Sequence, residues 1–239
     1  STLDCSDYSQ LYIKARNDPL KKITKMIIDA ITTQETYFFR DKSPFELLKF
    51  KILPDLIDHV MGGPSKNYPA LKIWSAACST GQELYSIAFV IKEMIPNIKV
   101  WNIDMIGTDI SDYVIEKASY GLYNKVEVER GLTQDKIIKY FNPIGTDWKI
   151  NDEIRAMMRF QKINLLEPFN TIGKFDIILC RNVAIYFSQD NKKKLFDRLA
   201  DHLNPNGVLM IGSTESLFSV SDRYNRQEYM NSIFYKKTN

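Results

Sequence analysis

One stretch decides the fold of this chain: Lys72-Ile-Trp-Ser-Ala-Ala-Cys-Ser-Thr-Gly-Gln-Glu-Leu-Tyr-Ser86. Its apolar run breaks at small residues, reaches Gly81, and resumes with apolar residues at helical spacing from Leu84 onward. This pattern predicts a buried strand, a tight turn and the first turns of a helix. In an open α/β sheet such a turn lies at the carboxyl end of a strand, where cofactors bind.

A second strand-like run, Met105-Ile-Gly-Thr-Asp109, ends in an acid. An acid there can accept hydrogen bonds from ribose hydroxyls, so a nucleoside cofactor is the first hypothesis. A dinucleotide site needs G-x-G-x-x-G, but this turn holds one glycine followed by Gln82 and Glu83. An acid at the helix start would repel a pyrophosphate and suits the cationic amino group of S-adenosylmethionine. On these residues alone, Gly81 and Asp109 could also be no more than a turn and a helix cap.

The composition is that of an ordinary soluble globular protein. The 239 residues, 44% hydrophobic and 26% charged, can bury one large core with at most a small appendage. The net charge of +3, with scattered basic residues, does not indicate a nucleic-acid partner, and no apolar run approaches the roughly 20 residues of a membrane span. The three cysteines and two histidines lack metal-ligand spacing, so we expect no metal site. The cysteine usage also predicts that the protein is located in a reducing cytosol. No secretory signal is visible, although a chain that starts at Ser1 could lack its natural N-terminus.

Strand and helix patterns alternate from residue 71 onward, after two helical patterns over residues 20–31 and 45–60. The alternation predicts an α/β fold, a mostly parallel sheet with helices on both faces. The run Ser232-Ile-Phe-Tyr-Lys236 has no helix after it and is expected to add an antiparallel strand. Strands are expected at 71–76, 103–108, 158–163, 175–180 and 207–212, and helices near 83–94, 111–118 and 190–203.

Residues 120–157 interrupt the alternation. They contain a charged patch at 125–130 and a short helical pattern near 133–140. We therefore expect a small inserted subdomain within an α/β domain over residues 63–239, preceded by a helical segment over residues 1–62. Long insertions in compact domains are often functional. A solvated excursion without a partner is an equally good interpretation of the sequence alone.

A polar segment, Thr32-Thr-Gln-Glu-Thr-Tyr-Phe-Phe-Arg40, follows the first helical pattern. It crowds hydroxyl, amide and charged groups around an aromatic pair. Taken alone, it fits a helix end with Phe38 and Phe39 in the core and Arg40 on the surface better than it fits a site.

Polar residues also follow the later apolar runs. Asn182 lies beyond the run that starts at Phe175, and Tyr186 is one helical turn further on. Asn182, like Asn164 after an earlier strand, either faces a ligand or serves as a turn or cap. Glu215, in the polar loop after the strand expected at 207–212, could cap a helix.

The order of these segments resembles the CheR family, the chemotaxis receptor methyltransferases that esterify glutamate side chains with S-adenosylmethionine. The match runs from about Tyr8 to the C-terminus. Its strongest anchors are T-x-F-F-R at 36–40, W-S-A-A-C-S-T-G at 74–81 and C-R-N-V-x-I-Y-F at 180–187. Supporting motifs are T-D at 108–109, N-L-L-E at 164–167 and G-S-T-E-S-L at 212–217.

The resemblance implies a Rossmann-like methyltransferase fold and a role for each matching residue. Thr36, Arg40 and Glu83 would contact the methionine part of the cofactor, and Asp109 would hold the ribose. Arg40 and Tyr186 would face the incoming carboxylate and form the catalytic pair. The adenine and the sulfonium side would be framed by Asn164, Leu165, Asn182 and Val183. The whole implied cofactor-binding set is Gln34, Thr36, Arg40, Ala77, Gly81, Glu83, Asp109, Asn164, Leu165, Asn182 and Val183, with no metal.

The resemblance also implies partners and a location. The protein substrate would be the cytoplasmic domain of chemotaxis receptors, docked with help from the insert at 120–157, and the product of the cofactor would be S-adenosylhomocysteine. The protein would act in the cytoplasm without nucleic acid or membrane insertion. Its oligomeric state stays open, with a monomer favoured.

The sequence departs from the family pattern at several positions. Gln34 stands where the family often has Asn, Gln82 and Leu84 replace parts of a common G-E-E-P run, and Ser213 stands where His is frequent. Only the last helices of the family's N-terminal helical domain fit in residues 1–60.

Two other classes of function compete with an active methyltransferase. A non-catalytic S-adenosylmethionine-binding adaptor would bind the cofactor without turnover, and the retained Arg40 and Tyr186 argue against it. A nicotinamide-dependent oxidoreductase is disfavoured by the absent glycine fingerprint.

Overall fold

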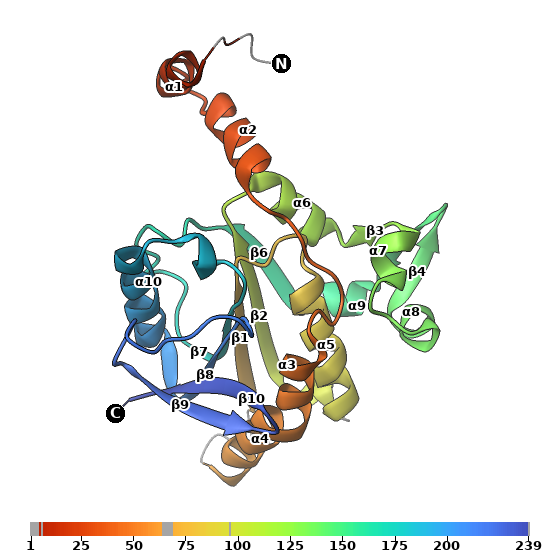
Figure 1. The fold of residues 1–239 in the computed structure, drawn as a ribbon. Coiled ribbons are helices and arrows are strands. Elements are labelled where there is room, and N and C mark those ends of the chain that lie inside the picture. The colour runs from red at the N-terminus through yellow and green to blue at the C-terminus, as the bar shows by residue number, and fades with distance from the viewer. Residues whose placement is uncertain (1–4, 6, 64–68, 96, 239) are drawn as a thin grey trace.

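The computed structural model describes residues 5, 7–63, 69–95 and 97–238 of the chain. Its centre is a seven-stranded sheet in the order β6-β2-β1-β7-β8-β10-β9 (Figure 1). The strands from β6 to β8 pair in parallel, and β10 pairs antiparallel with β8 and β9. The mostly parallel sheet and its antiparallel C-terminal strand are therefore confirmed. The strands are β1 (Ala70–Ala76), β2 (Asn102–Asp109), β6 (Met158–Lys162), β7 (Phe175–Cys180), β8 (Leu203–Ile211), β9 (Tyr224–Tyr229) and β10 (Ser232–Lys237).

Helices cover the sheet and lead into it. The pattern over 45–60 is divided into α3, a π-helical turn at Leu48–Ile52, and α4. The run Gly62-Gly63-Pro64 predicts the end of the second helical pattern; α4 ends at Gly62, and Pro64 lies outside the described residues. Within the described ranges, no helix is long and apolar enough to cross a membrane. The helices are α1 (Tyr8–Arg16), α2 (Lys22–Ile31), α3 (Lys42–Leu47), α4 (Leu53–Gly62), α5 (Gln82–Met94), α6 (Asp112–Tyr120), α7 (Lys125–Glu129), α8 (Gln134–Tyr140), α9 (Asp152–Arg155) and α10 (Gln189–Asp201).

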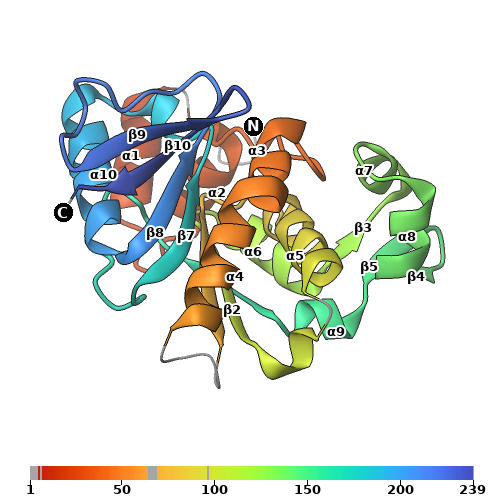
Figure 2. The same ribbon diagram turned by 90° about the horizontal axis from the view of Figure 1, so that it is seen from below.

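Alternate residues of the strands bury themselves in two different cores. Ile73 packs with α4 and α5 on one face, while its neighbour Trp74 packs with α10 on the other. Leu179 and Cys180 divide in the same way. Because successive side chains of a strand point to opposite faces, both faces of the sheet are covered (Figure 2). The predicted helices on both faces are confirmed, and this is why the strands read as continuous apolar runs.

A second sheet, in the order β3-β5-β4, lies apart from the main sheet, at the right of Figure 1. With α7, α8 and α9 it falls inside residues 120–157. Aromatic contacts fasten this insert to the body: Phe89 of α5 stacks on Tyr140 of α8 at 4.2 Å between ring centroids, and Phe38 meets both β3 and β4 edge-on. That the insert works as a subdomain remains a prediction. Its strands are β3 (Leu122–Tyr123), β4 (Phe141–Ile144) and β5 (Asp147–Ile150).

Helix α2 extends away from the body with α1, at the top of Figure 1, and is tied down at the start of α6. Asp112 accepts from Lys25 of α2 at 2.9 Å and from Lys162 at the end of β6 at 3.0 Å. The Ser111 hydroxyl donates to Asp29 of α2 at 2.5 Å. These contacts hold α2 beside the carboxyl edge of the sheet.

Protonation of Asp112 should weaken this tie. The two lysines, Lys25 first, lower the pKa of Asp112 below its usual value of 3.8. Because the pKa of Asp112 is lower in the folded state than in the unfolded state, ionised Asp112 stabilises the fold at any pH above its unfolded-state pKa. This stabilisation is lost as the pH falls through its folded-state pKa. We expect Asp112→Asn to be less stable than the parent by up to about 1 kcal/mol near neutral pH, because the pair is solvent-exposed. In thermal melts from about pH 7 to about pH 3, the difference in stability between the parent and Asp112→Asn should decrease as the pH falls. A difference that stays constant over this range would contradict the prediction.

Candidate functional site

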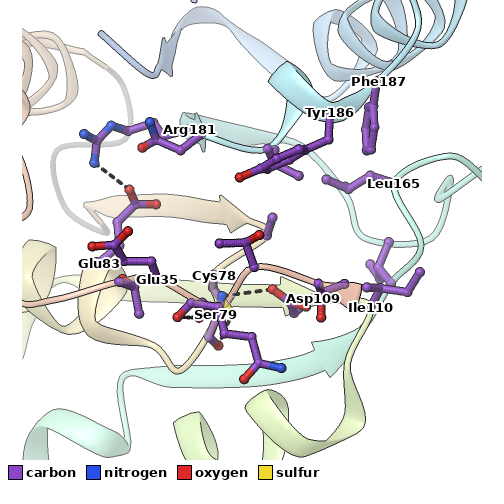
Figure 3. Close-up of a pocket in the computed structure, with 18 of the residues that line it drawn as sticks. Glu35, Cys78, Ser79, Glu83, Asp109, Ile110, Leu165, Arg181, Tyr186 and Phe187 are labelled. Atoms are coloured by element: carbon purple, nitrogen blue, oxygen red, sulfur yellow. Dashed lines mark hydrogen bonds and ion pairs between the residues drawn. The ribbon is translucent and has the colours of Figure 1, made fainter. Parts of the chain in front are cut away.

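A cavity of about 350 Å³ opens where four strands of the main sheet end. The carboxyl ends of β1, β2, β6 and β7 each deliver residues to its wall, as Figure 3 shows. From β1 the chain builds outward to β2 and β6 on one side and then crosses from β6 to β7 on the other side of β1. The cavity therefore lies at the switch point of the sheet. This is the place where open α/β sheets bind their ligands.

The turn after β1 forms the floor of the cavity. Ala77, Ser79 and Gly81 all have positive φ (62°, 49° and 93°), a conformation that non-glycine residues rarely adopt. Such backbone strain clusters at functional sites. Gly81 itself does not line the cavity: a Cβ there would meet Ala118 Cβ at 3.0 Å and the Tyr85 ring at 3.2 Å. Its role is to close the turn and start α5, which agrees with the interpretation of Gly81 as a turn residue that the sequence also allowed.

Asp109 lies beside this turn at the end of β2. One of its carboxylate oxygens accepts from the Ser79 amide at 2.9 Å and the other from the Ser111 amide at 3.1 Å. Burial raises the pKa of Asp109, and the two amides partly offset that. The carboxylate faces the middle of the cavity (Figure 3). Ser111, rather than Asp109, is the N-cap residue of α6, so Asp109 is not the helix cap that the sequence also allowed.

Glu83 and Arg181 mark one end of the cavity. Glu83 Oε1 accepts from the Ser75 hydroxyl and Glu83 Oε2 from Arg181, both at 2.8 Å. Arg181 also donates to Asp41 at 2.8 Å. Arg181 lies within the motif at 180–187, but no role was predicted for it. The feature that could have indicated a role is a charged residue directly after a buried strand.

Residues 32–41, called the strap below, cross the cavity. Phe38 is fully buried, and the Phe39 amide donates to the Ser86 hydroxyl at 2.9 Å. Arg40 lines the cavity, and its Nη1 donates to the Glu35 carbonyl at 2.5 Å. The interpretation of this segment as a helix end placed Phe38 in the core correctly, but Arg40 is half-buried at the cavity wall rather than on the open surface.

The ends of β6 and β7 supply the opposite wall. The side-chain Oδ1 of Asn164 accepts from the Leu166 amide at 3.0 Å, so the side chain stabilises a local turn while the residue lines the cavity. Asn182 has φ 58°, and its amide donates to Glu215 at 2.8 Å. Glu215 also accepts from the Gly212 amide at 2.7 Å. Glu215 does not cap a helix, contrary to the prediction: it joins the turns that follow β7 and β8.

Tyr186 stands at the mouth of the cavity on a short 3-10 turn after β7. Its side chain lies across the cavity from Ser79 and Asp109 (Figure 3), and 64% of the residue is exposed. An exposed phenol at a cavity mouth can meet an incoming substrate.

The structure gathers the residues that the sequence nominated. Of that set, Gly81 alone stays off the cavity wall. Some wall residues were not predicted from the sequence although they directly follow predicted strands, and that position could have indicated that they line the cavity. Wall residues that were not predicted are Ile31, Thr32, Thr33, Glu35, Cys78, Ser79, Ile110, Ile163, Leu166, Arg181 and Phe187.

Comparison with known proteins agrees with this geometry. The model of the CheR methyltransferase SAM-binding domain matches residues 34–233. The chain belongs to the CheR methyltransferase family. A chemotaxis protein methyltransferase of Pseudomonas putida is 36% identical over 95% of this chain and 82% of its own length. Proteins with that name from Pseudomonas aeruginosa (37%, covering 90% of this chain and 77% of the relative) and Vibrio cholerae (36%, 97% and 81%) are similar.

The CheR-type cavity is chemically suited to S-adenosylmethionine, the cofactor of this family. Its charged end, with Glu83 and Arg181, offers partners for an amino acid group, and Asp109 lies where a ribose would need acceptors (Figure 3). The far end, with Ile110 and Leu165, is apolar and suits a nucleobase. The protein is an S-adenosylmethionine-dependent methyltransferase with S-adenosylhomocysteine as the cofactor product.

Replacing Asp109 should weaken cofactor binding. In Asp109→Ala the ribose hydroxyls would lose a charged acceptor, and hydrogen bonds to charged groups contribute about 1.5–3 kcal/mol. We expect the Kd for S-adenosylhomocysteine in calorimetric titration to rise by about 10- to 100-fold. Asp104→Ala, on the same strand but in a surface pair with Arg159, is the matched control. Equal affinity of Asp109→Ala and the parent would remove Asp109 from the ribose site.

Proposed function

We propose that this protein transfers the methyl group of S-adenosylmethionine to glutamate side chains in the cytoplasmic domain of chemotaxis receptors, forming glutamate methyl esters. One observation carries the choice of a carboxylate acceptor: Arg40 and Tyr186 come to the cavity from two different segments, and no histidine lies in its described wall. The relatives' name, chemotaxis protein methyltransferase, supports the receptor as substrate.

The wall chemistry suits an acceptor that needs no base. A glutamate with a pKa near 4.3 is already ionised at neutral pH, whereas an amine or an alcohol must lose a proton. Glu83 is engaged by Ser75 and Arg181, and Asp109 by two backbone amides. Glu35, the third acid of the described wall, is paired with Arg130 at 2.9 Å. None of the three is therefore a free general base.

The residues of the chain have to align the acceptor and keep it ionised. S-adenosylmethionine, when bound, supplies a methyl group activated by its positive sulfur. Arg40 would pair with the substrate carboxylate and set its direction of approach, since a guanidinium holds a carboxylate in a defined plane. The Tyr186 hydroxyl would donate to the second carboxylate oxygen. Alignment of this kind supplies about 7–11 kcal/mol in well-oriented systems.

We propose that residues 1–62 form a helical segment and residues 63–239 the methyltransferase domain. The insert at 120–157 would be a subdomain of that domain and would help to dock the receptor. Its exposed residues Ile138 and Ile144 are available to a partner in the described structure. Work on a receptor's cytoplasmic domain would place the protein in the cytoplasm. We propose a monomer as the functional form.

The test is mass spectrometry of receptor peptides. A purified receptor cytoplasmic fragment is incubated with the protein and S-adenosylmethionine, and peptides are searched for a base-labile gain of one methyl on glutamate. Base-stable methylation would identify another acceptor atom. Cofactor binding by calorimetry without any methyl transfer to the fragment would favour the non-catalytic adaptor.

A further inference from the structure

Arg181 is a charged side chain buried at the end of an apolar strand. Its side chain is 2% exposed, and it follows Cys180, the last residue of β7. Its Nη1 lies 2.8 Å from Glu83 Oε2 and its Nη2 2.8 Å from Asp41 Oδ2. A buried charge without partners is strongly unfavourable, so these two carboxylates make the position possible.

The two pairs join segments that are distant in sequence. Glu83 is in the first turn of α5 and is also bonded to Ser75 of β1. Asp41 is the last residue of the strap and precedes α3. Arg181 therefore connects the floor of the cavity to the end of the strap, and Figure 3 shows it facing Glu83.

The strap needs such a connection next to Arg40. The residues on either side, Phe39 and Asp41, have φ of 53° and 55°, a left-handed conformation that is costly for residues with a side chain. The Asp41 side chain makes no capping hydrogen bond to α3, the helix it precedes. Its carboxylate instead reaches Arg181.

We propose that Arg181 is a positioning residue for methyl transfer: by bridging Asp41 and Glu83, it fixes where the strap places Arg40 over the cavity. Lysine would be a poorer bridge, because two different nitrogens of the planar guanidinium make the two contacts and a single ammonium nitrogen would have to serve both carboxylates. The inference rests on the proposed role of Arg40 toward the substrate carboxylate.

Asp41→Asn is the sharpest probe of the bridge. Asparagine has the same shape and tolerates the left-handed backbone as well as aspartate does, so the change removes charge without new strain. We expect kcat/KM for methylation of a receptor fragment to fall by about 10- to 100-fold, the range for loss of a charge-assisted hydrogen bond. Asp55→Asn, which breaks an exposed pair with Lys51 on α4, is the control and should leave the rate unchanged.

A double-mutant cycle separates positioning from general damage. In an Arg40→Ala background, Asp41→Asn should cost no more than about twofold, because the group that it positions is gone. A purely structural contact would cost the same factor in both backgrounds, and that result would overturn the proposal. Arg181→Lys should match Asp41→Asn in direction.

Amide exchange tests the bridge without a substrate. In Asp41→Asn and Arg181→Lys, the Phe39 and Arg40 amides should exchange about tenfold faster than in the parent, while the core of β1 should not change. Unchanged exchange in the strap would overturn the proposal. If the parent failed to methylate the receptor fragment, the proposed function would fall, and the exchange rates would still report whether Arg181 holds the strap.

Discussion

Arg40→Ala is expected to lower kcat/KM for receptor methylation by about 100- to 1000-fold, the range found when one charge-stabilising donor is removed from an active site. Arg40 lines the cavity and is held there by the strap, with one guanidinium nitrogen on the Glu35 carbonyl. Its removal leaves the substrate carboxylate without its proposed partner. The measurement is a radiolabelled methyl-transfer assay over a range of receptor-fragment concentrations.

Two variants and a control sharpen this result. Arg40→Lys keeps the charge but loses the two-pronged contact, so an intermediate rate is expected. Tyr186→Phe removes one hydrogen bond to the ionised substrate carboxylate and should cost about 10- to 100-fold. Arg226→Ala, on the exposed face of β9, should behave like the parent. If Arg40→Ala and Tyr186→Phe both kept parental rates, the proposed catalytic pair would be wrong.

Phe38→Ala is expected to cost about 3–5 kcal/mol in the free energy of unfolding, the largest stability loss among the strap residues. Phe38 is fully buried, and its ring meets Tyr123 at 5.1 Å and Phe141 at 5.6 Å, both edge-on. It also stacks on Phe89 at 6.2 Å. One ring thus joins the strap, α5 and both edge strands of the insert.

Urea denaturation followed by circular dichroism measures this loss. The urea concentration at the midpoint of unfolding should fall, while the slope of the unfolding free energy against urea concentration stays the same, as expected for a change in stability alone. Phe218→Ala is the matched control: this phenylalanine is 88% exposed, and its loss should change stability by less than about 0.5 kcal/mol. A Phe38→Ala protein as stable as the control would show that the strap is not anchored by this ring.

Local sequence determined most of the main sheet. The strand–turn–helix at 72–86 and the strands ending at Asp109 and Cys180 were predictable because buried parallel strands are continuous apolar runs between helical patterns. The antiparallel end was predicted only in part. β9 has one buried residue, Tyr224, in its first five, so it lacks an apolar pattern.

The nominated site residues came together because the ends of parallel strands share one edge of the sheet. That rule places Asp109, Asn164 and Asn182 at the same edge of the sheet without any knowledge of side-chain contacts. Motif resemblance added the strap, whose composition alone indicated an ordinary helix end. The strap became part of the wall only through Phe38, which is buried against segments distant in sequence.

The order of the strands and helices, and the residues at which the strands end, follow from periodicity and turn chemistry, which are local properties of the chain. Which charges meet depends on how the whole chain folds. Arg181 reaches Asp41 across 140 positions and Glu83 across 98, and Glu215 reaches Asn182 across 33. A buried ion needs a partner at contact distance, and nothing in the local pattern around Arg181 or Glu215 specifies which partner the folded chain will bring.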